Sequence, residues 1–392
     1  MVIRSRSSAF SLMNDGVGRR SGRRYLGGVT AGALVLASFV PAWAQGTLRL
    51  SEGPLVSIGS IDGSPQSVLH DVRGAVELGR EVYVADGGSQ EIRVFATSGQ
   101  YLRSFGGKGD GPEEFQQIGW IDTCGRGALL VYDYARWRVT EWTPEGQFVD
   151  GFRIEGPHPD RPPYSVGCGS GENFVVVGWP DVAQIEITVG PYRPHVVIGL
   201  TDERGHFVRS VGEFPGPERY RYPTNDGPRR LGKKTTAQIS ADGVFVGTAD
   251  YLQVVRITND GERMEIGPGS RGTELSPEMA ERWRESIVDR MPSARRPAAR
   301  RALRALELPA TLPAYVDFTL DSEGLLWIRP FALGGTDEAS RRWPVFDPSG
   351  VLLANVAIPA HFSPTDIGFD YVLGVGVDEL GVQRVHRYAL YR

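Results

Sequence analysis

Histidine and cysteine are scarce in this 392-residue sequence, and the catalytic motifs built on them are missing. The six histidines are scattered without HxH or HExxH spacing, so no metal site can be read from them. Neither a GxSxG motif nor a nucleophile-like cysteine with a paired histidine is visible. The stretch GGKGDGPEEF, residues 106–115, lacks the Gly-Lys-Ser/Thr ending of a phosphate-binding loop. The sequence therefore favours a protein that is not an enzyme.

A long hydrophobic run is also missing. The most apolar stretch, residues 26–40, is short, contains glycines and follows an arginine-rich segment at residues 19–24. It ends in Ala42-Trp43-Ala44, the small-x-small pattern of a cleaved signal peptide. A membrane anchor is the alternative. We expect residues 1–44 to be a signal peptide and the mature protein to be periplasmic or extracellular, with the Sec and twin-arginine export routes both open.

An excess of basic residues is absent as well. Removing the six Arg and one Asp of residues 1–44 changes the formal net charge from −4 to −9. Binding to nucleic acid or to anionic membranes needs a basic face, so an acidic protein argues against both. We expect a monomer without a nucleic-acid partner and without a membrane span after signal cleavage, whose partner is an unknown small ligand or protein.

Turns are abundant, and one kind of turn recurs between short apolar runs. The sequence has 50 glycines and 27 prolines. Asp, Asn or Pro followed by glycine in such a short connection predicts a tight hairpin turn with positive φ. A second hairpin precedes each of these turns, so the repeated unit is four short strands, a to d. The five turn glycines are Gly99, Gly146, Gly205, Gly261 and Gly350.

Four-stranded units at irregular spacing predict an array of propeller blades with insertions. A β-sandwich is the alternative, but it accounts for one or two such turns rather than five. Five full units run from about residue 67 to 359, and a sixth, one strand short, ends at Arg392. Residues 48–59 can supply the missing outer strand. We expect an all-β fold, a six-bladed β-propeller of four-stranded blades closed by an N-terminal strand, forming one domain over residues 45–392.

One stretch also resembles a known repeat. ADGGSQEIRVFATSGQYLRSFGGKGDGPEEF, residues 85–115, is similar to an NHL repeat, and the chain resembles the exported bacterial six-bladed propellers of the NHL-repeat-like group. The match is close only over residues 82–115, whereas the other blades share the layout. The resemblance implies the fold. The wider group contains binding proteins, lactonases, lyases and strictosidine-synthase-like enzymes, so it leaves the activity open.

The long segments between strands all fall on the same end of the predicted ring, which favours that end as the binding face. Residues 213–234 are the most suggestive, because aromatic rings offer stacking surfaces and arginine forks grip carboxylates or phosphates. A solvated loop whose tyrosines pack on the blade below is the alternative. The candidate ligand-binding residues are Arg219, Tyr220, Arg221, Tyr222, Arg229 and Arg230.

The largest insertion, about residues 274–307, predicts helices rather than strands. Ser276 is a typical helix cap, and Pro277 suits the first turn. Residues 290–306 contain six Arg and no acid, so this insertion could cap the channel mouth or clasp an acidic partner. A lid packed on the propeller with a solvated basic face is equally consistent with the sequence.

Our leading hypothesis is an exported propeller, with no cofactor, that binds a ligand or protein partner through the end of the ring where the long segments lie. We call this end the long-segment face. The alternative is a metal-assisted lactonase- or lyase-like enzyme with calcium or zinc at the channel mouth. Its candidate carboxylates are Asp110, Glu113 and Asp226, although no motif of those enzymes matches them. A purely structural envelope protein is a third hypothesis.

Cys124 and Cys168 occupy matching places in neighbouring blades, each beginning a Cys-Gly-x-Gly turn. An exported location permits a disulfide between them, provided that their Cα atoms come within about 7 Å. Two buried thiols at a repeated position are the alternative, and the sequence leaves both open.

Overall fold

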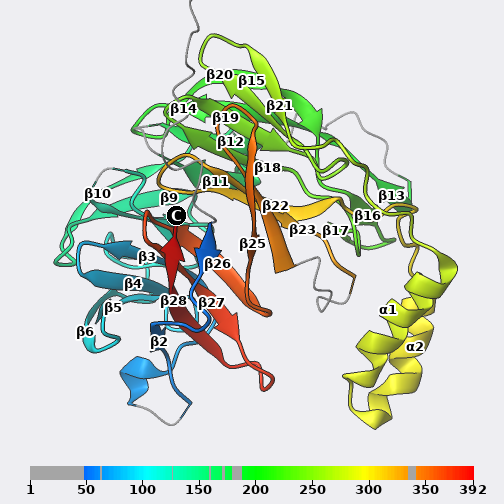
Figure 1. Ribbon diagram of the computed structural model, residues 1–392, viewed down its shortest axis with the longest axis horizontal. Coiled ribbons are helices and arrows are strands. Elements are labelled where there is room, and N and C mark those ends of the chain that lie inside the picture. The colour runs from blue at the N-terminus through cyan, green and yellow to red at the C-terminus, as the bar shows by residue number, and fades with distance from the viewer. Residues whose placement is uncertain are drawn as a thin grey trace, which may run out of the picture. The chain divides into compact units, whose positions relative to one another are not determined.

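The computed structural model describes residues 48–61, 64–125, 127–158, 160–169, 173–178, 188–333 and 341–392. The predicted signal peptide lies outside these residues. Antiparallel β-sheets dominate the described part of the chain, and a single helical insertion stands beside them (Figure 1). The all-β prediction is confirmed, as is the four-stranded unit.

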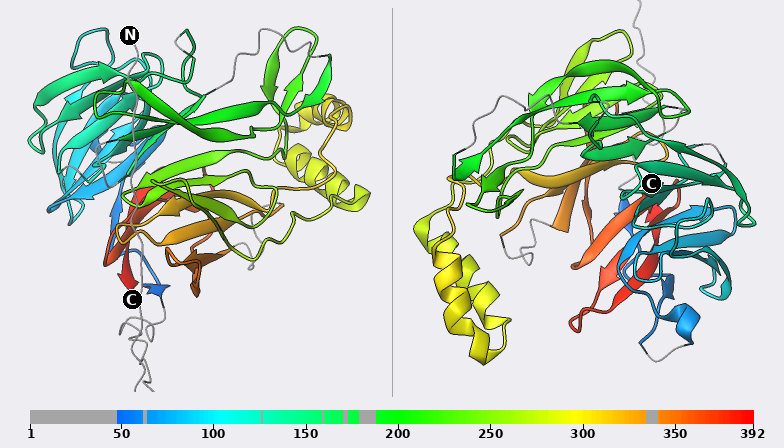
Figure 2. Two further views of the ribbon diagram at one scale, coloured as in Figure 1. Left: turned by 90° about the horizontal axis from the view of Figure 1, so that it is seen from above. Right: turned by 180° about the vertical axis from the view of Figure 1, so that it is seen from behind.

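Six antiparallel sheets of four or more strands follow one another along the described chain (Figure 2). The first two consist of β3 (Val72–Leu78), β4 (Glu81–Asp86), β5 (Glu91–Ala96) and β6 (Tyr101–Gly106), then β7 (Ile118–Asp122), β8 (Leu129–Asp133), β9 (Arg138–Trp142) and β10 (Phe148–Arg153). The next two consist of β11 (Ser165–Cys168), β12 (Phe174–Gly178), β14 (His195–Thr201) and β15 (Phe207–Pro215), then β18 (Thr236–Ser240), β19 (Gly243–Gly247), β20 (Val254–Thr258) and β21 (Arg263–Ile266). The last two consist of β22 (Tyr315–Leu320), β23 (Leu326–Pro330), β24 (Arg342–Phe346) and β25 (Leu352–Ala357), then β26 (Phe362–Ile367), β27 (Tyr371–Val377) and β28 (Gln383–Tyr391).

The five predicted turn glycines lie between the third and fourth strands of successive sheets. Each has a φ between 81° and 91°, a region that favours glycine because it has no Cβ. In each turn the glycine N–H donates to the carbonyl three residues earlier, as from Gly99 to Ala96 at 2.8 Å. The positive-φ prediction is confirmed at all five positions.

Buried aspartates close the turns after the second strand in the first two sheets. Asp86 and Asp133 are fully buried, and each accepts hydrogen bonds from the backbone N–H groups two and three residues later. The same side chains accept from His70 and Gln116, which enter from the preceding connection. This role accounts for Asp86, which follows the apolar run of residues 82–85.

Consecutive sheets share hydrophobic cores. Tyr83 of the first sheet and Trp142 of the second belong to one buried cluster, and equivalent clusters join each sheet to the next. A further cluster joins the last sheet to the first through Leu373, Val385 and Val82. This packing gives a β-propeller-like arrangement, because each sheet buries both of its faces against neighbouring sheets.

The N-terminal strands pair with the last strand of the chain. β1 (Arg49–Leu50) and β2 (Val56–Ile58) both run antiparallel to β28, and Ile58 is 2% exposed. The 3₁₀ turn η2 (Pro65–Ser67) then leads into β3. The last sheet thus takes its outermost strands from the start of the described chain.

The helical insertion consists of α1 (Pro277–Asp289), the 3₁₀ turn η3 (Ser293–Arg295) and α2 (Arg296–Arg304). The predicted cap is present, since Ser276 accepts a hydrogen bond from the N–H of Met279. Two extended segments form its stem, with Leu312 N–H donating to Thr273 at 2.8 Å. The two helices project from the sheets beside a small sheet of residues 190–192, 219–221 and 226–228 (Figures 1 and 2).

One structural prediction is wrong. Residues 213–234, expected as a loop, instead contain the end of β15 and a hairpin of β16 (Arg219–Arg221) and β17 (Asp226–Pro228). With β13 (Gly190–Tyr192) these strands make a three-stranded antiparallel sheet. Their short polar sequences have no apolar alternation, so the pattern used for the larger strands could not reveal them.

Candidate functional site

Arg219 and Asp226, both predicted as site residues, bind each other across the β16–β17 hairpin. The guanidinium of Arg219 lies 2.6 Å from the Asp226 carboxylate, which also accepts from the Tyr192 hydroxyl at 2.8 Å. Burial raises the pKa of Asp226, but the hydrogen bonds from Arg219 and Tyr192 outweigh it and hold the pKa below its ordinary value. This network stabilises the small sheet, so Arg219 has a structural role.

The other residues of the predicted group separate into two sets. The rings of Tyr220 and Tyr222 lie with centroids 4.8 Å apart, and the Nε of Arg221 is buried without a hydrogen-bond partner in the described chain. Tyr222, Arg229 and Arg230 line a hollow, which Tyr220 and Arg221 do not. The structure thus brings three of the six predicted residues to a concave surface.

Arg229 and Lys233 hold the stem of the helical insertion. Arg229 donates to the carbonyl of Leu308 at 2.9 Å. Lys233 is 7% exposed, and its ammonium donates to Glu218 at 3.2 Å and to the Thr311 hydroxyl at 3.0 Å. These contacts fasten the base of the insertion to the segment that follows β17.

Two hollows meet at the base of the insertion. One, of about 510 Å³, lies between the segment after β17 and the fifth sheet, and the other, of about 580 Å³, lies between α1, the stem and the end of β23. Pro313 and Phe331 line both, so the hollows adjoin. We call them the basic hollow and the helix hollow, and together the insertion cleft. Apart from Tyr315 and Val316 of β22, its lining residues lie in connections between the second and third strands of a sheet or between successive sheets.

The charge of the insertion cleft is of one sign. Its lining includes no aspartate or glutamate among the described residues, although the chain as a whole has more acids than bases. Aromatic surface comes from Tyr222, Trp283, Tyr315 and Phe331. The basic residues of the lining are Arg229, Arg230, Lys234, Arg271 and Arg282.

Sequence reasoning did not identify Arg271, Arg282, Trp283 and Phe331 as site residues. They come from the stem, α1 and the end of β23, segments that only the tertiary structure brings together. Arg282 and Trp283 lie in the predicted helical insertion. The expectation that this insertion could cap the channel mouth was the one sequence signal that pointed to them.

The basic stretch of α2 is largely neutralised by α1. Arg300 lies 2.6 Å from Glu285, and Arg304 lies 3.1 Å from Glu281. The acidic partner expected for this stretch is therefore, in part, the neighbouring helix. Arg295 and Arg301 remain exposed without a side-chain partner in the described chain.

The candidate channel-mouth carboxylates do not gather in one place. Asp110 lies between the first and second sheets, is 88% exposed and pairs with Arg136. Glu113 is exposed in the same connection, whereas Asp226 belongs to the β13–β16–β17 sheet. Among the described residues, these three do not form a group with metal-ligand spacing.

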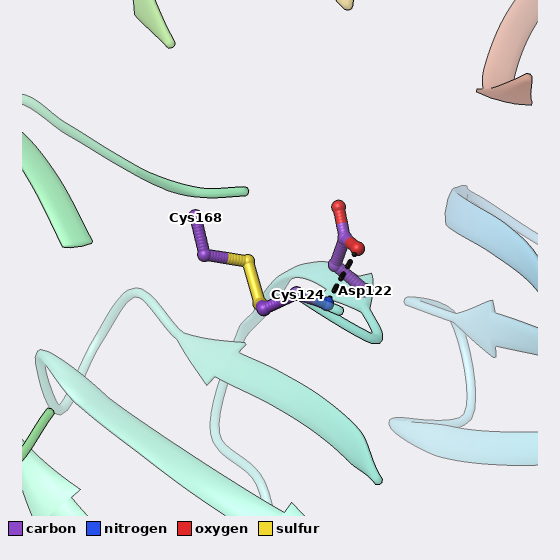
Figure 3. A group of neighbouring side chains, drawn as sticks. All are labelled: Asp122, Cys124 and Cys168. Atoms are coloured by element: carbon purple, nitrogen blue, oxygen red, sulfur yellow. Dashed lines mark hydrogen bonds between the residues drawn. A yellow bond between two sulfur atoms is a disulfide. The ribbon is translucent and has the colours of Figure 1, made fainter. Parts of the chain in front are cut away.

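Cys124 and Cys168 form a disulfide that joins the second and third sheets, with Cα atoms 5.4 Å apart (Figure 3). With Asp122 they make the one group of potential metal ligands in the described chain, but bonded sulfurs cannot act as thiolate ligands. Burial raises the pKa of Asp122 despite hydrogen bonds from the N–H groups of Thr123 and Cys124. The cluster is therefore a structural cross-link rather than a metal centre.

Comparisons with known proteins identify similar folds but no family. No family model and no curated protein matches the chain. Solved structures similar to it include an exported protein from Bacteroides fragilis (TM-score 0.46, 14% identity, 88% of this chain and 95% of that chain). A member of the duf4221 family from Bacteroides vulgatus has a TM-score of 0.48, with 8% identity over 88% of this chain and 98% of that chain.

A catalytically inactive virginiamycin B lyase from Staphylococcus aureus, solved with quinupristin, has a TM-score of 0.40, with 12% identity over 87% of this chain and 99% of that chain. At these scores and identities the similarities assign neither a ligand nor an activity. Separately, none of the described helices is long and apolar enough to span a membrane.

Proposed function

We propose that this protein is an exported six-bladed β-propeller of the NHL-repeat-like group that binds a small ligand in the insertion cleft. The observation that carries the proposal is the pair of adjoining hollows on the long-segment face. Each has the size of a small-molecule site, and aromatic side chains with a few polar groups line both.

The ring closure in this proposal rests on packing and pairing. Six sheets follow in order, a hydrophobic cluster lies between each consecutive pair, and Val82 of the first sheet packs with Leu373 of the last. β1 and β2 cover the edge of β28 that would otherwise be left unpaired. Such a ring is a rigid scaffold on which long connections can hold a site.

The metal-assisted lactonase- or lyase-like alternative has no comparable support. Asp110 and Glu113 lie in one connection and Asp226 in a different sheet, and Asp110 and Asp226 are paired with arginines. The structural envelope hypothesis gives no reason for a one-signed cleft beside the insertion. Ligand binding is therefore the function that the insertion cleft supports best.

The test uses a neutral, polarity-sensitive dye, phenylnaphthylamine, whose fluorescence rises in an apolar site. The wild-type protein should bind it saturably, and Trp283→Ala should weaken binding about tenfold because it removes a large apolar contact surface. Tyr251→Ala serves as the matched control, since Tyr251 is 51% exposed and lies outside the cleft lining. Absent saturable binding, or equal binding by Trp283→Ala, would overturn the proposal.

A further inference from the structure

Four basic side chains in the insertion cleft form no side-chain hydrogen bond or ion pair within the described chain, although the charge of Arg282 contributes, after the hydrogen bond from Ser276, to lowering the pKa of Glu278. Arg230, Lys234, Arg271 and Arg282 make no side-chain hydrogen bond or ion pair with any residue in the described ranges. Outside the cleft, Arg193 and Arg300 are paired, whereas Arg295 and Arg301 are not paired with any described side chain. Arg193 lies 2.8 Å from Asp250, and Arg300 lies 2.6 Å from Glu285.

The acids beside the basic hollow do not neutralise Arg230 or Lys234. Glu218 lies 3.9 Å from Arg229 and 3.2 Å from Lys233. Asp317, at the start of β22, is close enough to Lys234 for the lysine charge to lower its pKa, although burial raises that pKa overall. Its ion-pair contact, however, is with Arg329 at 3.8 Å. Arg230 and Lys234 are therefore left to solvent or to a ligand of opposite charge.

Both hollows offer basic and apolar side chains together. The basic hollow has Arg229, Arg230 and Lys234 around it, and their donors suit acidic oxygens. The helix hollow combines Arg271 and Arg282 with the apolar side chains Met279, Trp283 and Leu333. Phe331 and Pro313 line both hollows and form a shared wall between them.

From this lining of basic and apolar side chains, and resting on the proposed function, we infer that the ligand is an organic anion. Its carboxylate, phosphate or sulfonate group binds in the basic hollow, and its aromatic or aliphatic body lies against Trp283 and Phe331. Arg230 and Lys234 act as the anion-recognising pair, whereas Arg229 is already engaged with the stem. The absence of acids from the described lining favours an anion over a neutral molecule of the same shape.

A pair of dyes tests this inference. Anilinonaphthalene sulfonate carries the same aromatic body as phenylnaphthylamine plus one sulfonate. The wild-type protein should bind the sulfonate about tenfold more tightly, and added salt should reduce that preference because it screens exposed charges. The double variant Arg230→Gln/Lys234→Gln should bring the two dissociation constants together while leaving that of the neutral dye unchanged.

The matched control is Arg295→Gln/Arg301→Gln, which removes two exposed, unpaired cations outside the cleft lining. It should retain the wild-type preference for the sulfonate. A separate titration with inorganic phosphate as competitor shows whether the head group binds alone. Competition by phosphate would support an anion site and would indicate that the head group alone is enough for binding. Competition by alkyl carboxylates would also support an anion site.

Failure of the inference is distinguishable from failure of the proposed function. If the neutral dye binds in a Trp283-dependent manner but the sulfonate dye binds no more tightly than the neutral one, the cleft binds ligands without selecting anions. If the double variant retains the full preference for the sulfonate, Arg230 and Lys234 do not recognise the anion. If the preference is lost equally in the Arg295→Gln/Arg301→Gln control, the general charge of the surface causes it, and the inference is overturned.

Discussion

Arg392 donates a hydrogen bond of 2.8 Å to the carboxylate of Asp321, a side chain with no exposed surface. Asp321 lies in the turn between the first two strands of the fifth sheet, whereas Arg392 follows β28 of the last sheet. The same carboxylate accepts from the indole N–H of Trp327 at 3.0 Å. This contact ties the end of one sheet to the turn of its neighbour.

Replacing Arg392 should therefore destabilise the protein. Arg392→Ala leaves a buried carboxylate without its cation, and we expect a loss of about 2–3 kcal/mol in the free energy of unfolding. Equilibrium denaturation with urea measures it. Arg295→Ala is the control, because Arg295 is exposed and unpaired within the described residues. Equal stability of the two variants would contradict the role of the Asp321 contact.

The disulfide can be tested by thiol chemistry. The unreduced, unfolded protein should contain no thiol that reacts with a titrating reagent, since the described chain has no free cysteine. The cross-link closes a loop across 44 residues, so Cys124→Ala/Cys168→Ala should lower the free energy of unfolding by up to about 4 kcal/mol on the chain-entropy estimate. Two reactive thiols per unreduced chain would exclude the bridge.

The pairing of β1 and β2 with β28 predicts a strong dependence on the N-terminal segment. Deleting residues 45–60 should lower the melting temperature sharply, because it uncovers a strand edge and removes the buried Ile58. An unchanged melting curve would be incompatible with the proposed closure.

A matched pair of substitutions refines that test. Ile58→Ala should cost about 2–4 kcal/mol, because Ile58 packs between the first and last sheets. Leu55→Ala should cost little, since Leu55 is 59% exposed on the same segment. Similar losses for both variants would indicate that the segment does not pack as the structure describes.

Asp366 makes stability depend on pH. Burial raises its pKa from an ordinary 3.8 to about 6, against hydrogen bonds from the Glu77 N–H and the Tyr371 hydroxyl. Between about pH 4 and 6 the folded state binds more protons at this site than the unfolded state does. This carboxyl group therefore makes the protein less stable as the pH rises through that window, and its full cost persists above pH 6.

Asp366→Asn removes that cost while keeping a hydrogen-bond acceptor. We expect the variant to be more stable than the wild type by about 3 kcal/mol at pH 8 and equal to it near pH 4. Urea denaturation across this range measures the difference. Asp160→Asn, at an exposed position, is the control and should show no such pH dependence. A constant difference at all pH values would refute the assignment to Asp366.

Local patterns predicted the repeated unit well. The alternation of apolar runs with turn glycines indicated four-stranded antiparallel units, and the turn glycines have the φ values that the pattern requires. Ser276 and Pro277 likewise indicated where the first helix of the insertion begins, because a helix cap is also a local signal. Strand periodicity, turn chemistry and helix caps depend on residues close in sequence, so the sequence states them directly.

The site depended on contacts that no local pattern records. Arg219 and Asp226 were both candidates for function, yet their side chains satisfy each other across a hairpin whose polar strands gave no signal. Trp283 and Phe331 come from segments separated in sequence and meet only because the insertion stem folds back onto the sheets. Whether a charged side chain is free to bind a ligand depends on its neighbours in space. Only the tertiary structure could decide that, because those neighbours are set by the packing of whole sheets and of the insertion.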